Sequence, residues 1–146
     1  MANNVRPIFS HSKPDPSSYL NMPNTCAVVV TYNRKQTLAE CLQTILDGEM
    51  VPEKILVVDN ASTDRTPEFV EQTFPPLVSV LRLPRNMGGA GGFKAGIAEA
   101  LRLGYEFLWV MDDDHVLEKQ TFRELMDAMI RSGNDVVGPV IMAPSR

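Results

Sequence analysis

Three adjacent carboxylates follow an apolar, strand-like segment of this sequence. The segment is 107–111, and Asp112, Asp113 and Asp114 come directly after it. Because side chains alternate in direction along an extended chain, we expect Asp112 and Asp114 to point one way and Asp113 the other. Two carboxylates on one side of a strand end suit a hard cation such as Mg²⁺ or Mn²⁺. Phosphate oxygens often complete the coordination shell of such a cation. The alternative is a solvated acidic turn that caps the next helix.

Strand-like and helix-like patterns alternate along the chain. Short continuous apolar runs indicate strands that are covered on both faces, and apolar residues at helical spacing indicate amphipathic helices. The predicted strands are 26–30, 55–58, 78–83, 107–111 and, interrupted by Gly138 and Pro139, 136–141. The predicted helices carry the apolar positions of 38–46, 69–74, 93–101 and 122–130. This alternation predicts an α/β fold, a three-layer α/β/α sandwich around a mostly parallel sheet.

Polar residues follow four of the predicted strands. In such sheets, ligands bind beyond the carboxyl ends of the strands. The four segments are Thr31-Tyr32-Asn33-Arg34, Asp59-Asn60-Ala61-Ser62, Pro84-Arg85-Asn86 and Asp112-Asp113-Asp114. Their common position favours a binding site over a simple capping turn.

Composition limits the domain organisation and the class of partner. The 146 residues suffice for one domain, and we expect a Pro-rich arm at 1–24 before a single domain at 25–146. A net charge of −4 argues against nucleic acid as a partner. No apolar run is long enough for a transmembrane segment, and the amino end lacks the apolar core of a secretory signal. Cys26 and Cys41 are expected to be buried thiols in a reducing, cytoplasmic compartment.

The four segments together resemble the family-2 glycosyltransferases of the GT-A fold, whose nucleotide-binding half is Rossmann-like. The resemblance covers about residues 25 to 142 and includes the order of the motifs as well as their letters. The loop at 86–92, with the triple Asp, is similar to the branch that contains galactofuranosyl- and rhamnosyltransferases. The loop fits neither the dinucleotide fingerprint nor the P-loop, because Lys94 stands where a further glycine is needed and no Gly-Lys-Ser/Thr is present.

The resemblance implies a role for each matching residue. Thr31 and Tyr32 would line a uracil or thymine pocket, and Asp59 would accept a hydrogen bond from the imide N–H of the base. For Asp59 the alternative is a turn residue, and for Tyr32 an ordinary aromatic residue at a strand end. The expected nucleotide-binding residues are Thr31, Tyr32, Asn33, Arg34, Asp59, Arg85, Asn86, Gly88, Gly89, Lys94, Asp112 and Asp113. The expected ligands of Mg²⁺ or Mn²⁺ are Asp112 and Asp114.

Five further residues have more than one interpretation. His115 is either a further metal ligand or a surface or capping residue, and Asp64 is expected to cap a helix rather than to contact a ligand. Lys94 either neutralises the diphosphate, together with Arg85, or is a solvated surface residue, and the same two interpretations apply to Arg34. Trp109 lies within a strand and is expected to pack in the core rather than to bind a sugar.

The resemblance implies transfer of a sugar from a UDP- or dTDP-sugar to a hydroxyl of a glycan or lipid-linked saccharide, with inversion, in cell-envelope polysaccharide synthesis. Members of the family continue into an acceptor half that supplies an acidic catalytic base, and here no acidic residue follows Asp135. We therefore expect this chain to be the donor-binding half, located in the cytoplasm or at the inner face of the membrane. Its exposed apolar surface would be covered by a second copy of the chain or by the amino-terminal arm. The alternatives are a non-catalytic nucleotide-sugar-binding module and a sugar nucleotidyltransferase, although the latter should carry a glycine-rich signature where Thr31-Tyr32-Asn33 stands.

Overall fold

Four parallel strands alternate with four helices in the computed structural model, which describes residues 24–139. The strands are β1 (Thr25–Thr31), β2 (Lys54–Asp59), β3 (Val78–Arg82) and β4 (Phe107–Asp112). The helices are α1 (Lys35–Leu46), α2 (Thr66–Thr73), α3 (Gly88–Arg102) and α4 (Thr121–Ser132). The sheet order is β3-β2-β1-β4, and each neighbouring pair is parallel. None of the helices in this part of the chain is long and apolar enough to span a membrane.

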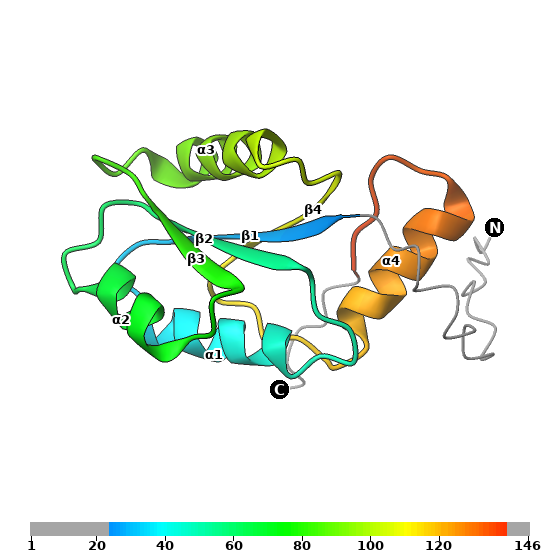
Figure 1. The fold of residues 1–146 in the computed structure, drawn as a ribbon, viewed down its shortest axis with the longest axis horizontal. Helices are drawn as coiled ribbons and strands as arrows, with labels where there is room; N and C mark the ends of the chain where they lie inside the picture. The colour runs from blue at the N-terminus through cyan, green and yellow to red at the C-terminus, as the bar shows by residue number, and fades with distance from the viewer. Residues whose placement is uncertain (1–23, 140–146) are drawn as a thin grey trace, which may run out of the picture.

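Helices cover both faces of the sheet, with α3 on one face and α1 and α2 on the other (Figure 1). Ala27 and Val29 of β1 belong to the hydrophobic cluster that includes α1. Cys26 and Val28 belong to the cluster that lies under α3. All of β1 is buried, because it lies inside the sheet and is covered on both sides. This confirms the predicted three-layer α/β arrangement.

Helix α3 begins at Gly88, earlier than the sequence pattern indicated. The prediction that 86–92 forms a loop before the helix is therefore wrong for all but its first two residues. Glycine is a poor helix former, so propensity alone favours a loop there. Tertiary packing overrides that propensity.

The glycines within α3 allow the helix backbone to lie directly on β1. A Cβ atom at Gly92 would come within 2.6 Å of Cγ1 of Val30, and one at Gly96 within 2.5 Å of Cγ1 of Val28. Any side chain at these two positions would push the helix away from the sheet. Leu101, one of the apolar positions of the predicted helix, is 56% exposed, because the buried positions of α3 are Gly92, Gly96 and Ala100.

The two ends of the chain differ from the prediction or lie outside the described residues. The arm predicted at 1–24 falls outside them except for its last residue. Helix α4 ends as expected at Gly133, which adopts a left-handed φ of 65°. The strand predicted from Val136 is wrong over 136–139, where the chain is irregular and Val136 is 82% exposed. Pro139 cannot donate a ladder hydrogen bond, which disfavours a strand.

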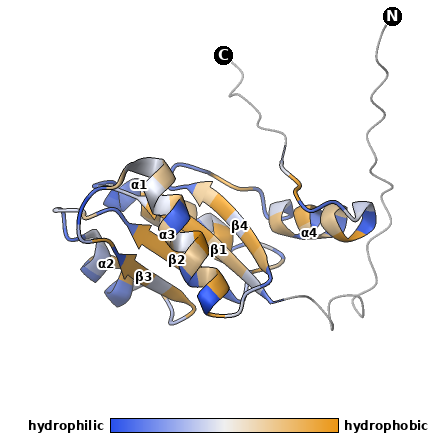
Figure 2. Ribbon diagram, turned by 90° about the horizontal axis from the view of Figure 1, so that it is seen from above, coloured by the Kyte–Doolittle hydropathy of each residue, from blue (hydrophilic) through white to orange (hydrophobic). Residues whose placement is uncertain are grey.

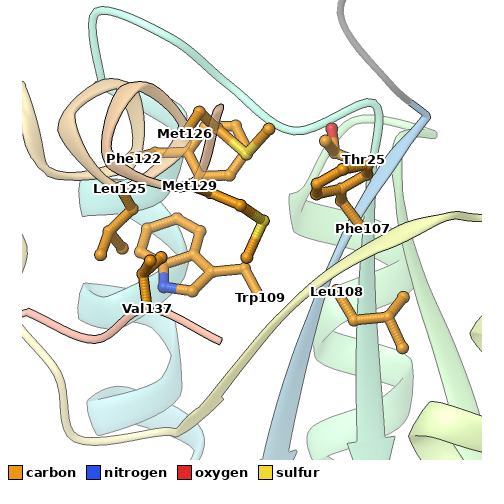
Figure 3. A pocket seen from close by; sticks show the side chains of 9 residues that line it. All are labelled: Thr25, Phe107, Leu108, Trp109, Phe122, Leu125, Met126, Met129 and Val137. Carbon is orange, nitrogen blue, oxygen red and sulfur yellow. The ribbon is translucent and has the colours of Figure 1, made fainter. Parts of the chain in front are cut away.

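Helix α4 packs beside β4 at one side of the sandwich (Figure 2). Trp109 of β4 stacks on Phe122 of α4, with ring centroids 4.9 Å apart and planes 18° from parallel, as expected for a packing residue. An apolar pocket lies between strand and helix (Figure 3). It is lined by Thr25, Phe107, Leu108, Trp109, Phe122, Leu125, Met126, Met129 and Val137. Because Thr25 and Phe107 begin their strands, the pocket lies away from the carboxyl ends where the site is predicted.

Cys26 and Cys41 are free, buried thiols, as predicted. Cys26 lies in β1 and Cys41 on the inward face of α1. Burial raises the pKa of each thiol from 9.0 to about 11. Both side chains therefore act as small hydrophobic groups at neutral pH.

Candidate functional site

The carboxyl ends of the strands lie together at one edge of the sheet. Parallel pairing places Thr31 of β1 beside Asp59 of β2, and Val30 of β1 beside Asp112 of β4. Neighbouring strands in a sheet are about 4.8 Å apart, so residues distant in sequence become neighbours. We call this row of residues, with the loops that follow Thr31, Asp59 and Asp112, the carboxyl edge.

Asp113 is the buried member of the acidic triplet. Its side chain is 4% exposed, and both of its oxygens accept hydrogen bonds. Thr31 donates its hydroxyl hydrogen to Oδ2 across 2.7 Å, and Arg34 donates from Nη1 to Oδ1 across 2.9 Å. Asp112 and Asp114 are exposed, which agrees with the predicted alternation. The triplet thus presents two carboxylates outward and uses the third to connect strands.

Arg34 is the cation that faces the triplet. Besides its bond to Asp113, its Nη1 lies 3.5 Å from Oδ2 of Asp114. The hydrogen bond from Arg34 to Asp113 and the negative charge of Asp113 raise the pKa of Arg34, and Asp114 adds to this effect. The guanidinium therefore partly neutralises the charge that the three carboxylates concentrate at the end of β4.

The outward carboxylates suit a divalent cation that is shared with a ligand. Within residues 24–139, no group of three or more His, Cys, Asp or Glu side chains is arranged to hold a metal ion. His115 directs Nδ1 to the carbonyl oxygen of Asp112 at 3.1 Å, so this ring nitrogen is a donor there and not a free metal ligand. Asp112 and Asp114 remain as hard oxygen ligands. Such a donor set fits Mg²⁺ or Mn²⁺ when phosphate oxygens and water complete the shell.

Asp59 is a buried carboxylate with one unpartnered oxygen. The residue is 2% exposed, and its Oδ2 accepts a hydrogen bond from the N–H of Ser62 at 3.1 Å. Its Oδ1 is buried and has no hydrogen-bond partner. A buried polar atom without a partner costs about 1–3 kcal/mol, so such atoms in native structures usually await a ligand or water. The position beside Thr31 places this acceptor at the carboxyl edge.

Two loops of the carboxyl edge are tied to each other. Asn33, after β1, donates its backbone N–H to the hydroxyl of Ser62 at 2.9 Å, and its Oδ1 accepts the N–H of Thr63 at 2.7 Å. Both loops use left-handed backbone, with φ of 51° at Asn33 and 63° at Ala61. The sequence motif included Ser62 but gave it no role, and Thr63 follows it directly. Their contacts hold Asn33 in place.

Asn60 ties the end of β2 to the start of α3, and the sequence reasoning missed it. The residue is 3% exposed. Its Oδ1 accepts the N–H of Met87 at 2.8 Å, and its Nδ2 donates to the carbonyl oxygen of Gly88 at 2.9 Å. Asn86 caps the same turn by accepting the N–H of Gly88 at 2.8 Å. One signal in the sequence could have revealed Asn60: it follows a predicted buried strand directly, and its side-chain amide carries both a donor and an acceptor. Because polar turn residues are usually exposed, this signal was not distinctive.

The remaining predicted contacts lie at the surface. They are Tyr32, Arg85, Gly89 and Lys94. Asp64, by contrast, accepts hydrogen bonds from the N–H and the hydroxyl of Thr66, the first residue of α2, as expected for a capping residue. Desolvation raises the pKa of Asp64, but the bonds from Thr66 and the proximity of Lys35 outweigh it, so the pKa lies below its ordinary value.

Residues 26–146 match the family described as Glycosyl transferase family 2. The galactofuranosyltransferase GlfT1 of Mycolicibacterium smegmatis is 42% identical over 90 residues, which are 61% of this chain and 29% of that protein. GlfT1 of Mycobacterium tuberculosis is 33% identical over 118 residues, which are 79% of this chain and 38% of that protein. The chain thus spans about a third of the length of these curated relatives.

Solved structures of glycosyltransferases share this fold. TarS 1–349 of S. aureus in complex with UDP-GlcNAc superposes with a TM-score of 0.67 at 24% identity, covering 84% of this chain and 37% of that one. The mannosyltransferase PcManGT of Pyrobaculum calidifontis, in complex with GDP-Man and Mn²⁺, gives 0.62 at 27% identity, covering 73% of this chain and 32% of that one. The family match extends over most of the chain, and the structures agree with it. The chain belongs to glycosyl transferase family 2, with a GT-A-like fold.

Proposed function

We propose that this chain is the donor-binding part of an inverting glycosyltransferase that uses a UDP- or dTDP-sugar. The acceptor is a hydroxyl of a glycan or lipid-linked saccharide in cell-envelope polysaccharide synthesis. The family match, the galactofuranosyltransferase relatives and the neighbour solved with UDP-GlcNAc support this proposal. We place the whole protein in the cytoplasm, at the inner face of the membrane where lipid-linked acceptors occur.

The observation that carries the proposal is the unpartnered Oδ1 of Asp59. The imide N–H of uracil or thymine supplies the donor that this acceptor lacks. Cytosine has an unprotonated ring nitrogen at the same position and supplies none. The exposed ring of Tyr32, which follows Thr31 beside Asp59, offers a face on which the base can stack.

The diphosphate is assigned to the positive and backbone donor groups around the start of α3. Arg85 precedes this helix and Lys94 lies on it. Gly88 and Gly89 leave its first turn open, since no atom besides their chain neighbours and the helix's own backbone lies within 4 Å of a Cβ built at either glycine. Helix N-termini favour anions because their first N–H groups lack intrahelical acceptors. Asn86 holds this turn. The bonds of Thr31 and Arg34 to Asp113, and those of Asn33 to Ser62 and Thr63, shape the rest of the site.

Asp112 and Asp114 would hold Mg²⁺ or Mn²⁺ together with the diphosphate. When bound, such a cation stabilises the negative charge that builds on the leaving diphosphate. Arg34 is 3.5 Å from Asp114, so its side chain must adjust when a second cation arrives. In this proposal Asp113 stays bonded to Thr31 and keeps the two outer carboxylates in position.

The proposed reaction is a single displacement at the anomeric carbon. The acceptor oxygen forms the new bond while the bond from carbon to the diphosphate oxygen breaks, and the acceptor proton passes to a carboxylate base. We assign that base to the part of the relatives that this chain does not match, because the matched segments cover only 29% and 38% of them. The second candidate function is a non-catalytic nucleotide-sugar-binding module. The family match favours either of these over a sugar nucleotidyltransferase.

The test compares UDP with CDP, two diphosphates that differ in the base edge which Asp59 would read. Calorimetric titration of the wild-type chain should show UDP binding at least about tenfold tighter than CDP, as expected for one unpaired polar contact. The variant Asp59→Asn should lose most of this preference, because its amide can present a donor to cytosine.

Asp64→Asn is the matched control, since this carboxylate lies in the same loop but bonds to Thr66. It should retain the wild-type preference for UDP. Equal affinity of the wild type for UDP and CDP, or no binding of either, would remove Asp59 as a base-reading residue.

A further inference from the structure

Asn60 connects the two parts of the proposed donor site. Its backbone N–H donates to the carbonyl oxygen of Thr31 at 2.9 Å, which fixes it at the end of the sheet. Its side-chain amide bonds in both directions with the backbone around the N-cap of α3, accepting from Met87 and donating to Gly88. The residue is 3% exposed, so water does not compete for these bonds.

Helix α3 rests on Asn60 as well as on the sheet. A Cβ at Gly92 would lie 2.6 Å from Cγ1 of Val30 and 3.6 Å from Nδ2 of Asn60. The close approach at Gly92 sets the distance of the helix from the sheet, whereas the two bonds of Asn60 fix the position of its first turn along the sheet surface. No side chain at the N-cap position of α3 caps the helix, so Asn60 and Asn86 supply side-chain anchors for this turn.

Asn60 also follows Asp59 directly in the chain. Its side-chain bonds therefore set the separation between the first turn of α3 and the carboxylate of Asp59, and loss of these bonds would let that separation change. A nucleoside diphosphate that uses both places can bind tightly only when this separation is fixed in advance, because a rigid site avoids the cost of ordering on binding.

We propose that Asn60 is a positioning residue that keeps the first turn of α3 at a fixed separation from Asp59. One ligand can then contact Asp59 with its base and the first turn of α3 with its diphosphate. This inference rests on the proposed function. It assigns Asn60 no contact with the ligand. Its effect falls on the diphosphate part of the ligand, since the base is read by Asp59 and Tyr32.

The experiment compares uridine with UDP in the wild type and in Asn60→Ala, by calorimetry or by amide chemical shifts. If removal of the anchors leaves the first turn correctly placed about a tenth of the time, the apparent affinity for UDP falls about tenfold. Uridine, which lacks the diphosphate, should bind the variant within twofold of the wild type. Asn24→Ala is the matched control, because Asn24 donates its side-chain amide to Gly104 at the opposite end of α3. It should change neither affinity.

Each outcome decides a different question. If the wild type binds neither ligand, the proposed function fails. If the wild type binds UDP but Asn60→Ala weakens uridine and UDP equally, or weakens neither, the positioning role is wrong while the proposed function stands.

Folding of the variants is checked by thermal unfolding. If Asn60→Ala does not fold, Gly92→Ala and Asn60→Asp replace it. The first moves α3 without changing Asn60, and the second keeps the acceptor for Met87 but loses the donor to Gly88. A folded replacement that keeps the wild-type ratio of UDP to uridine affinity would overturn the proposal.

Discussion

The hydroxyl of Thr31 donates a hydrogen bond of 2.7 Å to the carboxylate of Asp113, 82 positions later in the chain. The bond joins the ends of β1 and β4 at the carboxyl edge. Because Asp113 is turned inward to make it, Asp112 and Asp114 on either side are exposed. The buried contact therefore reinforces the strand alternation that leaves two carboxylates of the triplet available to a ligand.

Removal of the Thr31 hydroxyl should destabilise the protein. Thr31→Val keeps the branched shape but leaves a buried oxygen of Asp113 without this donor, which should lower the free energy of unfolding by about 1–3 kcal/mol. Urea-induced unfolding measures the effect. Thr73→Val, an exposed position at the end of α2, is the control and should stay within about 0.5 kcal/mol of the wild type. An equal effect in both variants would show that the bond to Asp113 contributes nothing of its own.

Arg34 should compete with a divalent cation for the acidic triplet. Its guanidinium lies 2.9 Å from Asp113 and 3.5 Å from Asp114, so Arg34→Gln should raise the affinity of the ligand-free protein for Mn²⁺. A partly exposed pair predicts a gain of about two- to fivefold. Arg82→Gln is the control, since Arg82 bridges Glu68 and Glu71 in the same manner and should leave Mn²⁺ binding unchanged. Weaker binding in Arg34→Gln would contradict this competition.

Binding of the nucleotide should depend on the divalent cation. UDP should bind more weakly in EDTA than in Mg²⁺. Without the cation, the negative charges of the diphosphate and of Asp112 and Asp114 are not neutralised. Asp114→Asn should reduce the effect of Mg²⁺ on UDP affinity while leaving the unfolding transition in place, since this carboxylate is exposed. Titrations with and without Mg²⁺ provide the measurement, and identical affinities in the wild type would assign the triplet to a structural role alone.

The buried thiols should make stability fall at high pH. Burial raises the pKa of Cys26 and Cys41 from 9.0 to about 11, so below pH 9 both are protonated in the folded and the unfolded protein. As the pH rises from 9 to 11, the unfolded chain ionises first and unfolding is favoured, by up to about 2–3 kcal/mol per thiol. The stabilisation is thus fully present below pH 9 and is lost as the pH passes through 11. The measurement is urea unfolding at several pH values, compared with the double variant Cys26→Ala and Cys41→Ala, whose stability should fall less steeply.

The strands and the edge that carries the site were predictable from the sequence. The runs at 26–30 and 55–58 are apolar at every position, which favours strands in a sheet covered on both faces, and the structure confirms this prediction. Their parallel order then brings the residues after them to one edge. The exposure of Asp112 and Asp114 follows from simple alternation along an extended chain.

The contacts that hold the site were not predictable, because they join residues distant in sequence. The pair of Thr31 and Asp113 depends on strand order, which propensity does not encode. The start of α3 at Gly88 depends on packing against Val30, which overrides the poor helix propensity of glycine. The strand expected from Val136 had an apolar pattern, but a pattern supplies no partner strand and Pro139 cannot pair as a donor.

The most direct test of the account is the location of the bound nucleotide. Amide correlation spectra of the wild-type chain, recorded during titration with UDP and Mg²⁺, report which residues respond. We predict shifts at Tyr32, Asn60, Gly89 and Asp114, which surround the carboxyl edge, and none at Asn24 and Glu106 at the opposite edge. Shifts concentrated around Trp109 and Phe122, in the apolar pocket beside α4, with the carboxyl edge unchanged, would contradict it.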